Sequence, residues 1–281
     1  MILFGINLGV IELYSHKYSK NRSLFKTLIV EWDLIYLIAT REIYARFKDS
    51  SLGFAWLFFQ PLVYVVIMGF FLSLIGRATN LGFSFVLYLF IGIVFFQTIA
   101  RCMASGSNFL RNKRSLTKQI YIDIDIIVLS SFMQILIDFL IMSSFVIVAF
   151  IVLNHEFNLF ALMIIPVIIQ FILFCLLICR GLSAVATIIP DVALAAPVLN
   201  QILFFGTPIF YTLTVIPESL IMVLSLNPLI YFVEISRYIL FDYISQYELT
   251  PIIISFISTT ILMVISYFIS QNYKKWSGYA Q

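Results

Sequence analysis

Residues 31–61 read EWDLIYLIATREIYARFKDSSLGFAWLFFQP and combine two predicted elements, an amphipathic helix and the start of a membrane span. Apolar residues recur every three or four positions in the first half, with most charged residues beside this stripe of Trp32, Ile35, Ala39, Ile43 and Phe47. The spacing predicts an amphipathic helix over 31–49 that lies in the membrane interface. An ordinary juxtamembrane helix with its positive charges on the cytoplasmic side fits the same pattern. After Asp49 no charged residue follows until Arg77, so the helix is expected to lead directly into a span.

The composition is that of a membrane protein rather than of a soluble enzyme. Charged residues make up 11% of the 281 residues, whereas they are about a quarter of an average soluble domain. The chain has no GxxxxGK[ST] loop for ATP, no GxSxG motif and no HExxH motif. Its two histidines lie far apart, and its three cysteines sit in apolar surroundings without metal-ligand spacing. We therefore expect no catalytic residue, metal or cofactor in this chain, and no nucleic-acid partner.

Six apolar stretches between charged residues are long enough to span a bilayer, which takes about 20 residues. The expected spans cover about 52–76, 78–101, 126–153, 158–179, 192–213 and 249–272. With the N-terminus inside, 15 of the 17 Lys and Arg residues lie on the inner side, and only Arg77 and Arg237 lie outside. The positive-inside rule then predicts that both ends of the chain are cytoplasmic. The fold class is an all-α polytopic membrane protein, with a cytoplasmic extension over 1–30 and a single transmembrane domain over 31–281.

The fifth span and the residues after it are irregular. Residues 192–217 read VALAAPVLNQILFFGTPIFYTLTVIP, and several residues there interrupt a lipid-facing pattern, namely Pro197, Asn200, Gln201, Gly206 and Pro208. Backbone groups that lose their helical hydrogen bonds at membrane depth have to face protein or a water-filled cavity. This span is therefore expected to line one of the two rather than to face lipid. Residues 217–247 are too charged to span and too apolar for a plain loop. They are predicted to form a re-entrant helical hairpin that enters from the outer face.

Asp138 is the clearest charge at membrane depth, and an intramembrane carboxylate is a functional candidate. No basic residue lies at a similar depth in the sequence, which predicts a protonated carboxyl group or one that faces a polar channel. Gln134 is about one turn earlier and is expected to share its polar face. A hydrogen bond between helices is the alternative.

The inside loop over 106–125 is the longest cytoplasmic connection. It contains NFLRNKRSLTKQIYIDID, with four basic residues and an apolar set of Phe109, Leu110, Leu116 and Ile120. A short amphipathic helix here is suited to docking into a groove on a soluble partner. The alternative is a solvated basic loop that only enforces the topology.

Several short motifs together resemble one protein family. The helix REIYARFK at 41–48 is followed by Ser51-Leu52-Gly53, Trp56 and Gln60-Pro61. Later come TPIFY at 207–211, LNPL at 226–229, and Arg237. The combination resembles the permease subunit of type-2 ABC exporters, in the branch that exports O-antigen, capsule or teichoic-acid polymers, and the resemblance runs from about Trp32 to the C-terminus.

The resemblance implies a homodimer in the bacterial cytoplasmic membrane, with a channel along the dimer interface. Two copies of a separate ATPase would bind ATP and Mg²⁺ and contact the inside loop through Phe109, Leu110, Leu116, Lys118 and Ile120. A polymer linked to a lipid pyrophosphate would load from the inner leaflet, where its phosphates would meet Arg41, Arg46 and Lys48. The channel and its periplasmic gate would involve Trp56, Gln60, Pro61, Asp138, Pro208, Tyr211, Asn227, Pro228 and Arg237.

The chain departs from the family pattern at two places. Family members often have a proline after the coupling helix, whereas residues 121–127 read YIDIDII. They often carry Arg-Asp before the fifth span, where this chain has Pro190-Asp191.

One alternative function is a type-2 ABC permease for a small lipophilic drug. The other is an ion-coupled secondary carrier, although such carriers often have broken helices in both halves and only the second half is clearly broken here.

Overall fold

The computed structural model describes residues 31–74, 82–108, 124–152, 159–213, 216–241 and 250–276, and these ranges form helices without any strand. The helices are α3 (Trp32–Phe47), α4 (Trp56–Leu74), α5 (Gly82–Ser107), α7 (Ile124–Val152), α8 (Ile164–Ile188), α9 (Val192–Gly206), α10 (Glu218–Leu224), α11 (Pro228–Phe241) and α12 (Thr250–Trp276). The 3-10 turns η2 (Gly53–Ala55) and η3 (Leu159–Met163) precede α4 and α8. Within the described part of the chain, five stretches are long and apolar enough to cross a membrane, and they contain α4, α5, α7, α8 and α12.

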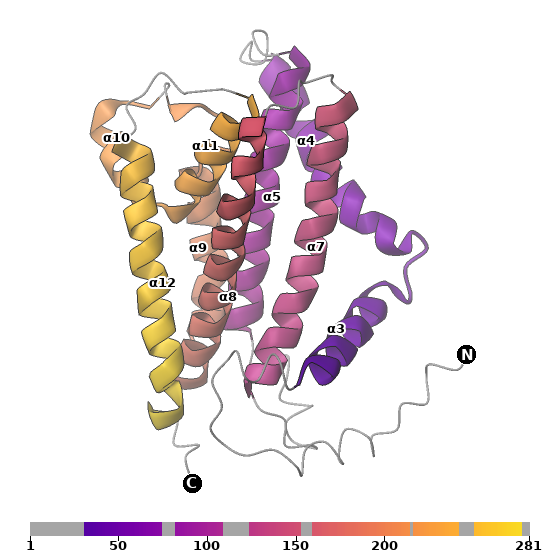
Figure 1. Cartoon of the computed structure of the whole chain (residues 1–281), viewed down its shortest axis with the longest axis vertical. Helices are drawn as coiled ribbons and strands as arrows, with labels where there is room; N and C mark the ends of the chain where they lie inside the picture. The colour runs from indigo at the N-terminus through magenta and orange to yellow at the C-terminus, as the bar shows by residue number, and fades with distance from the viewer. Residues whose placement is uncertain are drawn as a thin grey trace.

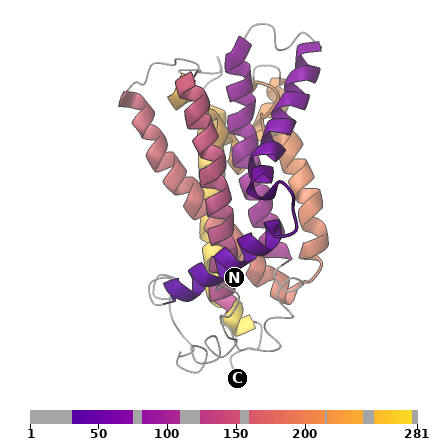
Figure 2. The ribbon, with the colours of Figure 1, turned by 90° about the vertical axis from the view of Figure 1, so that its right-hand side faces the viewer.

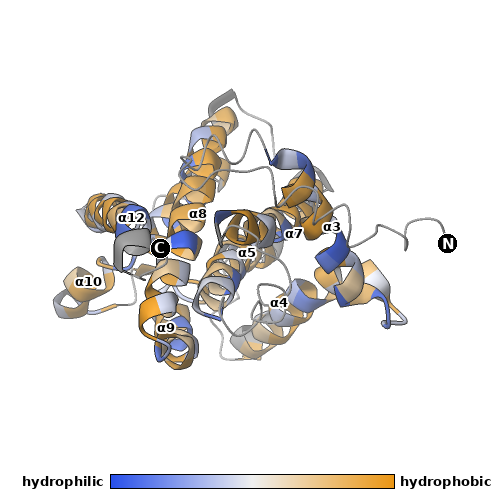
Figure 3. Ribbon diagram, turned by 90° about the horizontal axis from the view of Figure 1, so that it is seen from below, coloured by the Kyte–Doolittle hydropathy of each residue, from blue (hydrophilic) through white to orange (hydrophobic). Residues whose placement is uncertain are grey.

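Helix α5 lies at the centre of the bundle, with α4, α7, α8 and α9 around it (Figure 3). Helix α11 also packs against α5. In its apolar stretch 72% of the residues are buried, compared with 18% in the stretch that contains α4. Phenylalanine rings fill the space between α5, α8 and α11. The ring centroids of Phe95 and Phe171 are 4.7 Å apart, and those of Phe171 and Phe232 are 5.0 Å apart. Edge-to-face packing of this kind makes these three rings part of the core.

The amphipathic helix α3 slants along the lower part of α7 (Figures 1 and 2). Its buried residues are Ile35, Ala39 and Ile43, three of the five residues in the predicted apolar stripe. Ile35 packs against Ile126 and Leu129. The stripe therefore meets α7 through its central part.

A short turn leads from α3 into α4. Gly53 has a φ of +52°, in the left-handed region that glycine adopts at little cost. The backbone N–H of Gly53 donates to Oγ of Ser50 at 3.2 Å. The Ser-Leu-Gly sequence thus forms the turn between the amphipathic helix and the first long apolar helix.

The fifth predicted span, 192–213, is helical only as far as Gly206. Helix α9 has 15 residues, fewer than the about 20 that a straight span takes. The chain continues irregularly through residues 207–213. Helices α10 and α11 then follow, joined by a turn at 225–227, and both lie toward the upper end of the bundle (Figure 1). This end is opposite to α3.

Candidate functional site

Arg237 on α11 holds the irregular segment that follows α9. Its guanidinium is fully buried and donates to the carbonyl oxygens of Pro208 at 2.6 Å, Ile209 at 3.3 Å and Tyr88 at 2.9 Å. It also forms an ion pair with Glu234 at 2.8 Å. The residues that leave the helical pattern after Gly206 therefore find a hydrogen-bond donor inside the protein.

The surroundings of this guanidinium are shaped to fit it. The guanidinium carbon of Arg237 lies 3.4 Å from the centre of the Tyr88 ring, an arrangement in which the ring face attracts the cation. On α5, a Cβ atom placed on Gly92 would lie 3.0 Å from Nη2 of Arg237 and 3.2 Å from Cα of Ile209. A glycine at position 92 thus leaves room for both the arginine and the irregular segment.

Further hydrogen bonds involve this segment, and one of them joins it to the turn before α11. Nδ2 of Asn227 donates to Oγ1 of Thr207 at 2.9 Å, and Oδ1 of Asn227 accepts from the backbone N–H of Leu229 at 3.0 Å. The hydroxyl of Tyr211 donates to the carbonyl oxygen of Phe205 at 2.8 Å. Asn227 therefore connects the end of α9 to the first turn of α11.

These contacts bring together five of the predicted gate residues. Four of them are Pro208, Tyr211, Asn227 and Arg237, and the fifth is Pro228, which begins α11 directly after Asn227. Tyr88 also donates its hydroxyl to the carbonyl oxygen of Tyr211 at 2.9 Å. We call this set the gate network, after the role predicted for five of its members: Tyr88, Thr207, Pro208, Tyr211, Asn227, Pro228, Glu234 and Arg237. The hydrogen bonds and ion pairs described for it come from α5, the end of α9, the segment after it, the turn before α11 and α11 itself.

Three other predicted channel residues lie elsewhere, on α4. Trp56 and Gln60 are exposed, and Pro61 is buried within the helix. Helix α4 packs against α5 and α7. The structure of the single chain thus does not join these residues to the gate network.

Asp138 on α7 has two basic partners, and the expectation that no basic residue lies at its depth is wrong. Its Oδ2 atom accepts from Nη1 of Arg46 at 2.7 Å and from Nη1 of Arg101 at 2.6 Å. The side chain of Asp138 is only 3% exposed. Arg46 on α3 and Arg101 on α5 precede Asp138 by 92 and 37 positions. Because of this large separation in sequence, their closeness in space was not predicted. Asp138 thus makes a contact between helices, which is the alternative that the sequence left open, and this contact consists of two ion pairs.

A second contact joins α3 to α7 one turn away. The side-chain amide of Gln134 donates to Oε2 of Glu42. Gln134 and Asp138 therefore both face α3, as their spacing predicted. The three residues expected to meet phosphate are all exposed, and Arg46 also pairs with Asp138.

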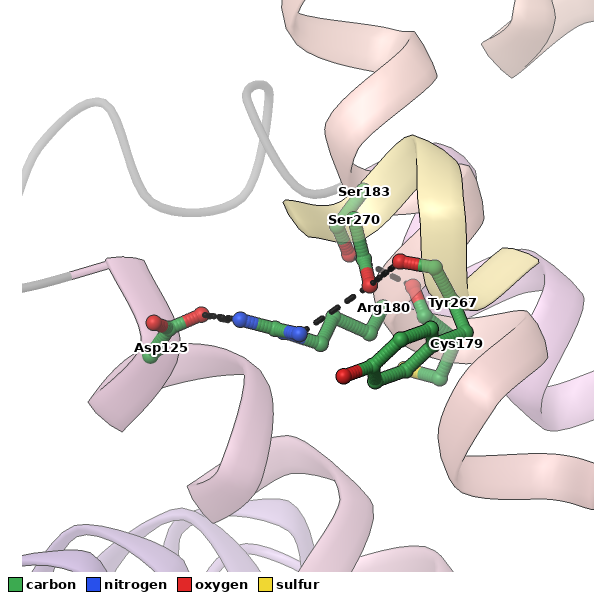
Figure 4. A network of polar contacts seen from close by, with 6 residues as sticks. All are labelled: Asp125, Cys179, Arg180, Ser183, Tyr267 and Ser270. Carbon is green, nitrogen blue, oxygen red and sulfur yellow. Dashed lines mark hydrogen bonds and ion pairs between the residues drawn. The ribbon is translucent and has the colours of Figure 1, made fainter. Parts of the chain in front are cut away.

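A third polar network lies at the lower end of the bundle and was missed in the sequence. Nε and Nη2 of Arg180, on α8, each donate to Oδ1 of Asp125 at 3.1 Å (Figure 4). Nη1 of Arg180 donates to Oγ of Ser270 on α12 at 3.0 Å. In the sequence these two charges only marked the ends of apolar stretches. The available signal was Arg180, which is the only charged residue in the sequence between Glu156 and Asp191.

The predicted ATPase contacts lie outside the described residues. The five residues Phe109, Leu110, Leu116, Lys118 and Ile120 all fall between Asn108, the last residue described after α5, and Ile124, where α7 begins. Within the described ranges no group of three or more His, Cys, Asp or Glu side chains is placed to hold a metal ion.

Comparison with known proteins places these networks in a family. Residues 33–241, from α3 to α11, match the family described as ABC-2 type transporter. The O-antigen export system permease protein RfbA of Myxococcus xanthus is 22% identical over 200 residues, which cover 70% of this chain and 76% of that protein. Two Klebsiella pneumoniae proteins of the same name are 25% and 24% identical, covering 83% and 84% of this chain and 89% and 93% of their own length.

The family match spans most of the chain and includes the gate network and the contacts of Asp138. Together with the long apolar helices, it identifies a multi-pass membrane protein that serves as a transport subunit rather than a catalytic one. The chain belongs to the ABC-2 type transporter family.

Proposed function

We propose that this chain is the channel-forming permease subunit of an ATP-driven exporter that moves a lipid-linked polysaccharide, O-antigen, across the bacterial cytoplasmic membrane. The observation that carries the proposal is its similarity to three O-antigen export permeases over 70–84% of its length. Those alignments are long enough to include most of the helical bundle rather than one shared segment.

The proposed topology has six crossings, with both ends of the chain in the cytoplasm. The fifth crossing consists of the short helix α9 and the irregular segment after it, and the hairpin α10–α11 is re-entrant from the periplasmic side. The gate network supports this arrangement, because irregular backbone at membrane depth is tolerated where protein groups satisfy it or where it lines a cavity. Arg237 supplies donors to two carbonyl oxygens of that segment, those of Pro208 and Ile209.

The channel is proposed to lie between two copies of the chain. Within one copy, the space around α5 is filled by packed rings such as Phe95, Phe171 and Phe232. Apolar side chains are exposed along α4 and α9, among them Val66, Phe70, Leu194, Ile202 and Phe205. Lipid and a second copy are the two surroundings that such faces suit. The wall of the channel in this proposal includes the irregular segment at the end of α9.

ATP and Mg²⁺ are proposed to bind to a separate ATPase subunit, present in two copies, because this chain has no P-loop motif. The inside loop between α5 and α7 is the proposed docking segment.

The pyrophosphate of the lipid-linked polymer is proposed to load beside α3, where Arg41 and Lys48 are exposed. Guanidinium and ammonium groups are the protein's usual partners for phosphate oxygens.

The test is co-purification followed by an activity assay. The chain is expressed with the ATPase encoded beside its gene, and ATP hydrolysis by the complex is measured in lipid nanodiscs with and without lipid-linked O-antigen. A stable complex whose hydrolysis responds to the glycan is the expected result. A stable complex that responds to lipophilic drugs and ignores the glycan would favour drug export. A chain that binds no ATPase would overturn the proposal and favour an ion-coupled carrier.

A further inference from the structure

Two consecutive residues of α8, Cys179 and Arg180, contact both flanks of the inside loop. On the first flank, α5 approaches α8 so closely at Gly106 that an added Cβ would lie 2.6 Å from the carbonyl oxygen of Cys179. Gly106 is the residue before the last one of α5. The end of α5 is therefore in direct backbone contact with α8.

On the second flank, Asp125 is the second residue of α7 and is fixed to Arg180. Two N–H groups of the guanidinium reach Oδ1 of Asp125, each at 3.1 Å. The side chains of Arg180 and Asp125 are 5% and 1% exposed. Because the pair is shielded from water and held by two hydrogen bonds, its geometry is well defined.

The same guanidinium also reaches the last long helix (Figure 4). Arg180 donates to Oγ of Ser270, whose own hydroxyl donates to the carbonyl oxygen of Tyr267 at 2.7 Å. Next to this contact, a Cβ atom on Gly181 would lie 3.0 Å from Cβ of Ser266. Helices α8 and α12 thus touch closely at the level of Arg180.

Replacing a buried ion pair by apolar groups is often neutral or stabilising, so stability alone is a weak reason for this arrangement. What the pair does provide is a directional link between three helices. Asp125 cannot shift relative to α8 without breaking two hydrogen bonds, and Arg180 cannot shift relative to α12 without losing Ser270.

We propose that Arg180 is the positioning residue that passes a displacement at the start of α7 to α8 and α12. The inference rests on the proposed function, in which an ATPase docks on the inside loop and moves it. With the contacts of Arg180 intact, a displacement of Asp125 carries α8 and α12 with it. Without them, the start of α7 moves alone and ATP hydrolysis is no longer coupled to a movement of α8 and α12.

The experiment measures coupling rather than activity alone. Arg180→Gln, Asp125→Asn and Arg180→Lys are made in the complex with its ATPase, and hydrolysis is measured in nanodiscs with and without lipid-linked O-antigen. Ser183→Ala is the matched control, because Ser183 is buried one turn along α8 and its hydroxyl donates to Cys179 of its own helix. Translocation of the polymer into vesicles is measured in parallel.

Arg180→Gln and Asp125→Asn are expected to hydrolyse ATP at the basal rate while glycan stimulation falls about fivefold or more, a typical size for coupling between sites. Arg180→Lys keeps the charge but not the fork of donors, and partial stimulation is expected. Ser183→Ala is expected to respond like the wild type. If Arg180→Gln is not recovered as a folded complex, Ser270→Ala keeps the Asp125 pair, and it should lower translocation per ATP.

Two results separate the two proposals. A wild-type chain that fails to bind the ATPase, or whose complex ignores the glycan, overturns the proposed function. A wild-type complex that responds to the glycan, with undiminished stimulation in Asp125→Asn and Arg180→Lys, overturns only the role of Arg180.

Discussion

Arg237 donates a 2.6 Å hydrogen bond to the carbonyl oxygen of Pro208, which lies 29 residues earlier in the chain. Pro208 follows the end of α9, where no helix continues to supply donors to its carbonyl group. The guanidinium also bonds to the carbonyl of Tyr88 on α5. One side chain of α11 therefore connects the irregular segment to the central helix.

Arg237→Ala is expected to destabilise the protein by about 3–5 kcal/mol, because it leaves the buried carboxylate of Glu234 without its cation and removes a donor from three carbonyl groups. Unfolding by increasing SDS, followed by tryptophan fluorescence, measures the loss. The surface variant Arg41→Ala should stay within about 0.5 kcal/mol of the wild type.

A second variant separates the contribution of the unpaired charge from that of the carbonyl groups. Glu234→Gln added to Arg237→Ala removes the uncompensated charge, so part of the stability is expected to return. An Arg237→Ala variant as stable as Arg41→Ala would mean that the carbonyl groups find other partners.

Asp138→Asn is expected to loosen α3, because both Arg46 and Arg101 lose their ion pair with this residue. Hydrogen bonds to charged groups contribute about 1.5–3 kcal/mol, so amide hydrogen exchange should rise throughout α3. Gln134→Leu removes the neighbouring contact with Glu42 and should have a smaller effect on the same amides. Exchange in α3 that is unchanged by Asp138→Asn would contradict the role of the ion pair.

Two glycine-to-alanine changes test the close approach of α5 to α8. A Cβ on Gly106 would overlap the backbone of α8, so Gly106→Ala is expected to cost about 1–3 kcal/mol. On α4, the nearest atom to a Cβ on Gly69 is Cδ1 of Leu89 at 3.9 Å, an ordinary contact. Gly69→Ala should therefore be neutral or stabilise the protein by about 0.5–1 kcal/mol, since alanine favours helices. Equal unfolding midpoints for the two variants would contradict the predicted clash.

Charge reversal at Arg41 and Lys48 tests the proposed phosphate contact. The double variant Arg41→Glu/Lys48→Glu should bind the ATPase and form the dimer, but should not translocate the lipid-linked polymer into vesicles. Arg41→Lys/Lys48→Arg keeps both charges and should remain active. Reversal of Arg46 is a poorer test, because it would place a carboxylate opposite Asp138 and disturb α3 as well. Full translocation by the reversed double variant would exclude these two residues from loading.

Polar substitution in the inside loop tests the proposed docking segment. Leu110→Asn/Leu116→Asn removes the apolar face that the sequence predicts for a helix docked in a groove of the ATPase. The expected result is a permease that is inserted and folded but no longer co-purifies with the ATPase. Co-purification at the wild-type yield would favour the alternative of a loop that only enforces topology.

The long helices were predictable from sequence because the length of an apolar stretch is a local property. The gaps between charged residues gave segments that contain much of α4, α5, α7, α8 and α12. The shortness of α9 was not predicted, although Gly206 and Pro208 indicated an irregularity there. The helix ends where the chain finds donors on other helices, and those donors are not visible in the local sequence.

The polar contacts were less predictable, for a physical reason. The sequence showed Asp138 to be at membrane depth, yet its partners come from two other helices. Arg237 counted as one of two outer basic residues, although the structure buries it completely. Whether an arginine is solvated or buried depends on the helices that pack around it, which the spacing along one helix does not reveal.

The contacts between α3 and α7 also restrict how these helices can move. Glu42 and Arg46 are four residues apart on α3, and their partners Gln134 and Asp138 are four apart on α7. If α3 slid one turn in one direction, Glu42 would come opposite Asp138, two carboxylates facing each other. A slide the other way would set Arg46 opposite Gln134 and separate it from its anion. One register is therefore favoured, and a movement of α3 during a transport cycle has to lift the helix off α7 rather than ratchet along it.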